Sequence, residues 1–233
     1  MNVIDLNKFK LKSKRIILVS TLCALTAVFA VLCALTATLA AFEEAAFIFL
    51  QSRANTFFTT LARILTFAGF FPLLIGIDLV IEVIPPSRHK FGFMSAFAAG
   101  AGYTINHIFK VIFQRPRPSV NQMVNSTGLS FPSGHSAAAA AFFVVILIYV
   151  VVNVKDKSIS IPSIILCVAM PIIVAISRVY LGVHYITDTV AGLVLGTIIA
   201  LLVGLVLWLL LKRKLNKFVR VHSFLFGKQN SDK

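Results

Sequence analysis

Charged residues are scarce in this chain, and most of those present are basic. Only 13% of the 233 residues are charged, with 22 Lys and Arg against 8 Asp and Glu, whereas hydrophobic residues make up 58%. Ordinary globular domains carry about 25% charged and about 45–50% apolar residues. This shortage excludes a soluble globular enzyme, a disordered segment and a typical nucleic-acid-binding protein. It also raises the question of why so hydrophobic a chain has a net charge of +14.

Cysteine is nearly absent as well. Cys23, Cys33 and Cys167 all lie inside apolar runs, and no Cys-x-x-Cys or Cys/His ligand spacing occurs. This pattern favours small apolar core residues over a disulfide framework or a metal site. The sequence also lacks a long internal repeat and a low-complexity linker, so we expect a single domain over residues 1–233.

The chain contains several long apolar segments with few charged residues. A helix needs about 20 mostly apolar residues to cross a bilayer core, and backbone groups in lipid must be bonded within their own segment. The sequence therefore predicts an all-α, polytopic membrane protein with six transmembrane helices in a bundle. The predicted spans are residues 16–41, 64–84, 91–113, 137–154, 159–180 and 188–211.

The basic residues are unevenly divided between the two predicted membrane faces. With six spans, 16 of the 22 Lys and Arg fall on the face that carries both termini. The positive-inside rule places this face, with the basic segments 1–15 and 212–233, in the cytoplasm. The first span exceeds the apolar length of a signal peptide, about 7–15 residues, so we expect it to be retained. The basic residues on the other face are Arg53, Arg63, Lys110, Arg115, Arg117 and Arg178.

Unusual polar residues gather at the other predicted face. The loop at 114–136 contains Gln-Arg-Pro-Arg-Pro-Ser and Phe-Pro-Ser-Gly-His-Ser, and the turn at 181–187 contains Gly-Val-His-Tyr. In a six-span topology the ends of spans three to six meet at this surface. Charges at a membrane boundary are costly and are functional candidates. The candidate residues are Lys110, Arg117, Ser133, Gly134, His135, Arg178, His184 and Asp188.

The cationic members of this set predict a site for a strongly anionic group. Arg117 and Arg178 can each hold two anionic oxygens, and Lys110 adds a point charge. Ser133 and Gly134 lie at a predicted helix start, where free N–H groups and the helix dipole favour phosphate. The glycine also allows close approach of the backbone.

The two histidines predict chemistry as well as binding. His135 and His184 can serve as a general acid and a nucleophile. Asp188 follows His184 by four residues, which puts both on one face of a helix start and lets the carboxylate fix the imidazole tautomer. Acidic residues near the motifs are limited to Asp188, too few for a Mg²⁺ site.

Other polar residues invite more modest interpretations. The loop at 42–63 is interpreted as an interfacial helix without chemistry, and Arg115 and Arg117 as either a rigid solvated turn or part of the site. Asp78, inside the second span, favours a structural pairing with a neighbouring helix. His107 either lines the site or bonds between helices.

Three ordered motifs make up this set of residues. They are Lys110-(six residues)-Arg117-Pro118, Pro132-Ser133-Gly134-His135 and Ser177-Arg178-(five residues)-His184-(three residues)-Asp188. They resemble the signature of the type 2 phosphatidic acid phosphatase superfamily. In particular, they resemble its bacterial membrane branch, which hydrolyses phosphatidylglycerophosphate, phosphatidic acid or undecaprenyl pyrophosphate.

The resemblance implies a role for each residue. His184 would attack phosphorus and form a phosphohistidine, Asp188 would orient it, and His135 would protonate the leaving oxygen and then activate water. The phosphoryl oxygens would be held by Lys110, Arg117, Ser133, Gly134 and Arg178. The family uses no metal or other cofactor. The resemblance places the site on the extracytoplasmic side of a bacterial inner or plasma membrane.

Two alternative functions remain open from the sequence. A lipid-to-lipid phosphotransferase would use the same phosphohistidine chemistry. An anion or lipid transporter would use the cations for binding, but the polar groups at helix ends on one side argue against it. The expected partners are a membrane lipid substrate and the bilayer, with no nucleic acid, and the oligomeric state is open.

Overall fold

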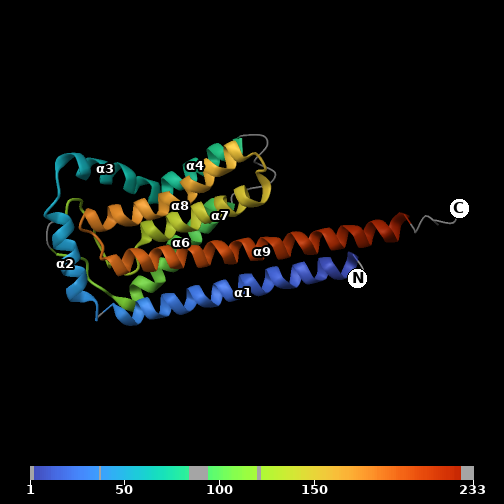
Figure 1. The fold of residues 1–233 in the computed structure, drawn as a ribbon, viewed down its shortest axis with the longest axis horizontal. Helices are drawn as coiled ribbons and strands as arrows, with labels where there is room; N and C mark the ends of the chain where they lie inside the picture. Colours follow the sequence, from blue (N-terminus) through green and yellow to red (C-terminus); the bar gives the residue numbers. More distant parts are fainter. Residues whose placement is uncertain (1–2, 37, 84–93, 120–121, 227–233) are drawn as a thin grey trace. The chain divides into compact units, whose positions relative to one another are not determined.

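The computed structural model describes residues 3–36, 38–83, 94–119 and 122–226, and this part of the chain is helical with connecting loops (Figure 1). The chain forms two compact units, Met1–Leu201 and Leu202–Lys233. The second contains the last part of the final helix, and the site described below lies in the first. The elements are α1 (Val3–Leu35), α2 (Ala40–Gln51), α3 (Thr56–Thr66), the 3-10 turn η1 (Phe67–Gly69), α4 (Phe71–Val83), α6 (Met94–Phe113), α7 (Gly134–Asn153), α8 (Lys157–Tyr180) and α9 (Ile186–Phe226).

The prediction of an all-α protein is confirmed, whereas the count of six spans stays a prediction. Four described helical segments are long and apolar enough to cross a membrane. A fifth candidate is the pair Thr56–Gly69 and Phe71–Val80, which is bent by 64°. The predicted third span corresponds to α6, which is 20 residues long but is not among these candidates. The four segments are Ile16–Leu35, Gly134–Asn153, Lys157–Tyr180 and Ile186–Val206.

Two predicted spans differ from the observed helices at their ends. The span expected at 16–41 stops with α1 at Leu35, and α2 begins within the same apolar stretch. The span expected at 64–84 starts in α3 and crosses the bend into α4. Pro72 is the second residue of α4, where its missing N–H is tolerated, but it would break a continuous helix.

The first unit is held together by close contact of α7 with α6 and α9. The run Ala137–Ala141 at the start of α7 is buried. A Cβ atom at Gly196 of α9 would lie 2.2 Å from the carbonyl oxygen of Ala137, and one at Gly192 would lie 2.6 Å from that of Ser133. Small residues on facing helices allow backbones to approach this closely. This contact brings the start of α7 against the start of α9.

The bend between α3 and α4 is held against the start of α7. A Cβ atom at Gly69 would lie 2.7 Å both from the carbonyl oxygen of His135 and from Cγ1 of Val174 in α8. The next residue, Phe70, stacks on the His135 ring with 6.5 Å between ring centroids. The break in the helix therefore brings an aromatic side chain to a candidate site residue.

Candidate active site

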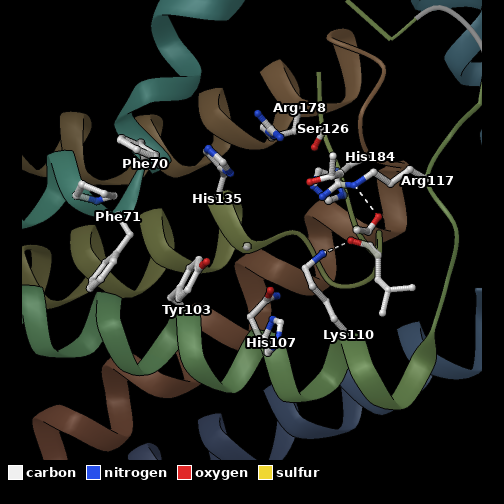
Figure 2. Close-up of a pocket in the computed structure, with 17 residues that line it drawn as sticks. Phe70, Phe71, Tyr103, His107, Lys110, Arg117, Ser126, His135, Arg178 and His184 are labelled. Atoms are coloured by element: carbon white, nitrogen blue, oxygen red, sulfur yellow. Dashed lines mark hydrogen bonds between the residues drawn. The ribbon is translucent and has the colours of Figure 1, made fainter. Parts of the chain in front are cut away.

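The three sequence motifs come together around one cavity of about 540 Å³ (Figure 2). Lys110 projects from the last turn of α6, His135 from the first turn of α7 and Arg178 from the last turn of α8. Ser133 and Asp188 are fully buried and do not line the cavity. The predicted residues that line it are Lys110, Arg117, Gly134, His135, Arg178 and His184.

His184 lies in the turn between α8 and α9 with 1% of its surface exposed. Its Nε2 atom is 3.1 Å from Nη1 of Arg117. An arginine can only donate, so Nε2 accepts and carries a lone pair, and the proton of the neutral ring is on Nδ1. Burial lowers the pKa of His184 to about 3 although Asp188 opposes the shift. The imidazole is therefore neutral, which is the nucleophilic form.

Asp188, in the first turn of α9, faces the protonated side of this imidazole. Its Oδ2 lies 3.4 Å from Nδ1 of His184, a long contact. The same oxygen accepts hydrogen bonds from the Ser130 hydroxyl and, at 2.9 Å, from the backbone N–H of Tyr185. Oδ1 accepts from Nη1 of Arg115 at 2.8 Å. The pairing expected from the four-residue spacing is thus present, within a larger set of donors.

Lys110 and Arg117 bind the loop that covers the cavity. The Lys110 ammonium donates to the carbonyl oxygens of Leu129 and, at 3.1 Å, of Ser130. Arg117 donates from Nε to Gly128 at 3.1 Å and from Nη1 to Val183 at 2.8 Å. Burial lowers the pKa of Arg117, but guanidinium remains charged at neutral pH. These two cations therefore fix the loop while they face the cavity.

Arg178 keeps a buried donor without a partner. Only 6% of its surface is exposed, and its Nη1 donates to the Thr66 hydroxyl at 3.1 Å. Its Nε has no hydrogen-bond partner among the described residues. A buried guanidinium N–H without an acceptor is costly, and an anionic oxygen in the cavity would satisfy it.

The start of α7 is linked to the third motif through its backbone. Ser133, the residue before the first helical residue, donates its N–H to the Asp188 carbonyl at 2.9 Å, and its hydroxyl accepts from Ser136 at 3.1 Å. That amide is therefore occupied. A Cβ at Gly134 would lie 3.2 Å from Oδ1 of Asn106, so glycine suits this crowded position. The first amides of a helix have no acceptor within it, which leaves those of α7 available to an anion.

A second cavity of about 640 Å³ adjoins the first. The two share Phe70, Ser126, His135 and Arg178 in their linings, and the second also includes Arg63. His135 therefore faces both spaces, which suits a group that transfers protons to and from a leaving or entering oxygen.

Around Asp188, Ser130 and Glu43 have no chemistry assigned from the sequence, and Arg115 has two open interpretations, a solvated turn or part of the site. Ser130 and Arg115 each donate a hydrogen bond to the carboxylate of Asp188. Arg115 also donates to Glu43 of α2, whose surface is only 1% exposed. The segment at 42–63 had been expected to carry no chemistry. The sequence does contain one signal for this role of Glu43, an acidic residue within an apolar segment. A buried carboxylate needs a partner that compensates its charge. In contrast, Asp78 accepts from Ser95 of α6, in agreement with its predicted pairing to a neighbouring helix.

His107 lines the cavity together with Tyr103 from the same face of α6 (Figure 2). Phe70, Phe71 and Pro72 at the bend also line it, and the Phe71 ring stacks on that of Tyr103 with 5.6 Å between centroids. The cavity is thus cationic where the motifs meet and aromatic toward α4 and α6. An amphiphilic ligand with an anionic head matches both ends.

Known proteins are similar to this chain in sequence and in fold. The family model described as PAP2 superfamily matches residues 91–215. Phosphatidylglycerophosphatase B of Bacillus subtilis is 31% identical over 113 residues, which cover 48% of this chain and 56% of that protein. Lipid phosphate phosphatase delta of Arabidopsis thaliana is 28% identical over 127 residues, which cover 49% of this chain and 29% of that protein. The chain thus spans about half the length of the first relative and less of the second.

Two crystal structures have the same arrangement of helices. The first, a transmembrane PAP2-type phosphatidylglycerolphosphate phosphatase from Bacillus subtilis, superposes with a TM-score of 0.70 at 27% identity, covering 79% of this chain and 94% of that one. The second, LpxE of Aquifex aeolicus, gives a TM-score of 0.53 at 20% identity, covering 68% of this chain and 92% of that one, and shows similarity of fold alone. Because the family match covers more than half of the sequence and includes every motif residue at the cavity, the chain belongs to the PAP2 superfamily.

Proposed function

We propose that this protein is an integral membrane lipid phosphatase that hydrolyses a phosphomonoester or pyrophosphate through a phosphohistidine intermediate. The observation that carries the proposal is the neutral, buried His184 beside three cationic side chains, with His135 lining the same cavity. Undecaprenyl pyrophosphate, phosphatidylglycerophosphate and phosphatidic acid are the proposed substrates. The name of the Bacillus relative favours phosphatidylglycerophosphate.

In the proposed first step, Nε2 of His184 forms a bond to phosphorus as the bond from phosphorus to the leaving oxygen breaks. His135 gives its proton to that oxygen. The positive charge that develops on the His184 ring is stabilised by Asp188 through Nδ1. Lys110, Arg117 and Arg178 bind the equatorial oxygens, where charge accumulates in the transition state.

In the second step, His135 accepts a proton from water, whose oxygen attacks phosphorus while the phosphorus–nitrogen bond breaks. Inorganic phosphate and the neutral His184 result. No metal takes part in either step, because the groups around the cavity are cationic side chains that perform the electrostatic role themselves.

The lipid character of the substrate is supported by the aromatic end of the cavity. Tyr103 of α6 has 54% of its surface exposed, and Phe70 at the bend has 43%. Many other apolar side chains on the helices are also exposed, as expected for surfaces that contact lipid tails. We propose that the head enters toward the motifs and that the tails remain on the bilayer side, at the extracytoplasmic face of a bacterial membrane.

A substrate panel with purified protein in one detergent tests this function. It contains phosphatidylglycerophosphate, phosphatidic acid, undecaprenyl pyrophosphate and a phosphorylated lipid A. We expect phosphate release from at least one lipid, a loss of at least about a thousandfold in His184→Ala, and full activity in excess EDTA. Undiminished activity of His184→Ala would refute the mechanism, and Mg²⁺-restorable loss in EDTA would refute metal independence.

A lipid-to-lipid phosphotransferase is the second candidate, and the adjoining cavity at His135 favours it because an acceptor hydroxyl could bind there. The phosphohistidine would then pass its phosphoryl group to that hydroxyl instead of water. Labelled phosphate from a pyrophosphate lipid separates the two reactions. Label on a second lipid indicates transfer, and label in inorganic phosphate indicates hydrolysis.

A further inference from the structure

A buried chain of ion pairs connects α2 to the residue that orients His184. Oε2 of Glu43 lies 2.5 Å from Nη2 of Arg115, and Nη1 of Arg115 lies 2.8 Å from Oδ1 of Asp188. The side chains of Glu43 and Asp188 are 1% and 0% exposed, and that of Arg115 is 13% exposed. One guanidinium therefore bridges two buried carboxylates, a geometry that its planar fork of donors permits.

Glu43 also holds the start of α9. Its second oxygen, Oε1, accepts from the backbone N–H of Thr187 at 2.7 Å and from the Thr187 hydroxyl at 2.5 Å. The free amides at a helix start carry partial positive charge, so a carboxylate there is stabilising. Because Thr187 directly precedes Asp188, Glu43 fixes the backbone that carries the orienting carboxylate as well as the cation that binds it.

Arg115 is restrained on every side. In addition to both carboxylates it donates to the Thr187 hydroxyl at 2.8 Å, and its guanidinium lies 4.2 Å from the centre of the Tyr185 ring. Burial lowers the pKa of Arg115, but Asp188 and Glu43 outweigh this effect and raise it. Arg115 does not line the cavity that holds His184, and Asp188 is the partner through which it reaches the His184 ring.

We propose that Glu43 and Arg115 are positioning residues, which hold the Asp188 carboxylate where it keeps the proton of His184 on Nδ1 and leaves Nε2 unprotonated as the attacking atom. This inference rests on the proposed phosphatase function. Without Arg115, Oδ1 of Asp188 loses its charged donor, and the carboxylate is held through Oδ2 alone, by the Ser130 hydroxyl and the Tyr185 backbone N–H. Without the Glu43 charge, Arg115 loses one of its two anchors, and Asp188 loses its fixed geometry.

The test compares kcat and KM for Glu43→Gln and Glu44→Gln on the lipid with the highest activity. Glu44 is the matched control because it is the neighbouring acid and is exposed. The amide of Glu43→Gln can still accept from Thr187 but cannot pair with Arg115 as an anion. We expect kcat to fall about 10- to 100-fold, as for the loss of one charge-assisted bond, with little change in KM. Glu44→Gln should match the wild type.

A double-mutant cycle separates positioning from general support of the fold. If Glu43 acts through Asp188, Glu43→Gln should lower kcat little further in an Asp188→Asn background, measured with radiolabelled lipid. An equal fold-loss in both backgrounds would overturn the proposal, and so would wild-type kcat in Glu43→Gln. His184→Ala is assayed in parallel, because its retained activity would refute the phosphatase mechanism and not this inference alone.

A pair of Arg115 variants keeps the proposal testable if Glu43→Gln fails to fold or Asp188→Asn turns over too slowly. Lysine retains one charged contact to Asp188 but cannot bridge both carboxylates, whereas glutamine retains no charge. We expect kcat to decrease from wild type to Arg115→Lys to Arg115→Gln at similar KM. Equal kcat in the two variants would contradict a positioning role.

Discussion

At the scale of single residues, the arrangement of donors around His184 determines its chemical state. Arg117 approaches Nε2 at 3.1 Å and Asp188 approaches Nδ1 at 3.4 Å. A donor on one side and an acceptor on the other select a single neutral tautomer. Arg117, which contacts Nε2 from the cavity, also binds the substrate in the proposed mechanism. Phosphate binding and nucleophile preparation thus share Arg117.

The burial of His184 predicts how stability depends on pH. Its pKa is lowered to about 3 in the folded chain, against an ordinary value of 6.5. Between these values the unfolded chain binds the proton more readily, so the free energy of unfolding falls as pH is lowered through this window and levels off below it. At pH 5 the contribution of this residue is a loss of about 2 kcal/mol relative to pH 7.

Chemical unfolding in detergent at pH 7 and pH 5 measures this effect. The wild type should lose more stability between the two conditions than His184→Gln, which cannot be protonated in this range. Equal losses in the two proteins would show that the buried imidazole is not the source of the acid sensitivity.

The residues that line or adjoin the cavity could be identified from the sequence where their spacing is local. His184 and Asp188 are one helical turn apart, and the first and second motifs each occupy a short stretch. Glu43 and Arg115 are separated by 72 positions, and their contact depends on how α2 packs against the start of α9. No short-range pattern indicates that contact, and for this reason the 42–63 segment was interpreted as an interfacial helix without chemistry.

At the scale of elements, contact between α7 and α9 determines whether the motifs meet. The backbone bond from Ser133 to Asp188 joins the starts of these two helices, and Gly192 and Gly196 let them approach below it. The site is therefore built on a helix contact that has no room for additional atoms.

A methyl group at this contact should destabilise the protein. In Gly196→Ala the new Cβ would lie 2.2 Å from a backbone oxygen of α7, so the helices must move apart. We expect a loss of about 1–3 kcal/mol in the free energy of unfolding and a reduced kcat, because the shift reaches Ser133 and Asp188.

Gly76→Ala is the control, since a Cβ there meets nothing within 4 Å and alanine favours a helix. Thermal unfolding and phosphate release measured on both variants test the expectation. A Gly196→Ala protein as stable and active as Gly76→Ala would contradict the role of this contact.

Helix positions were easier to predict than helix breaks. The bounds of α7 and α8 are close to those of the predicted spans 137–154 and 159–180. The bend between α3 and α4 was missed because both helices are apolar, and hydropathy does not distinguish a bent pair from a straight span. The bend follows from Pro72 and from the fit of Gly69 against His135 and α8, which is a tertiary contact.

At the scale of the whole molecule, the distribution of basic residues predicts which face the site occupies. In the predicted six-span topology, 16 of the 22 basic residues fall on one face, and Lys110, Arg117 and Arg178 fall on the other. A cation that stands against the positive-inside bias requires an anionic partner, and a bound phosphate provides one. We therefore propose two reasons for the excess of basic residues, membrane topology and phosphate binding.

Single cysteines test this topology. In a background without the three native cysteines, Ser52→Cys lies between α2 and α3, and Ser158→Cys lies at the start of α8, both at exposed positions. We expect Ser52→Cys to react with a membrane-impermeant maleimide in intact cells and Ser158→Cys to react only after permeabilisation. The reverse pattern would invert the proposed orientation, and labelling of both in intact cells would contradict the odd number of predicted spans, three, between them.

The position of Glu43 has a consequence for how this protein can be divided. The family region begins at residue 91, whereas the carboxylate that holds Arg115 is contributed by α2, well before it. A chimera that joins residues 91–215 to a foreign N-terminal segment would inherit all three motifs but not this carboxylate. Such a graft needs a replacement acid on the new partner helix, placed to meet Arg115 and the first turn of α9. The recognisable family segment is thus smaller than the part of the chain that builds its site.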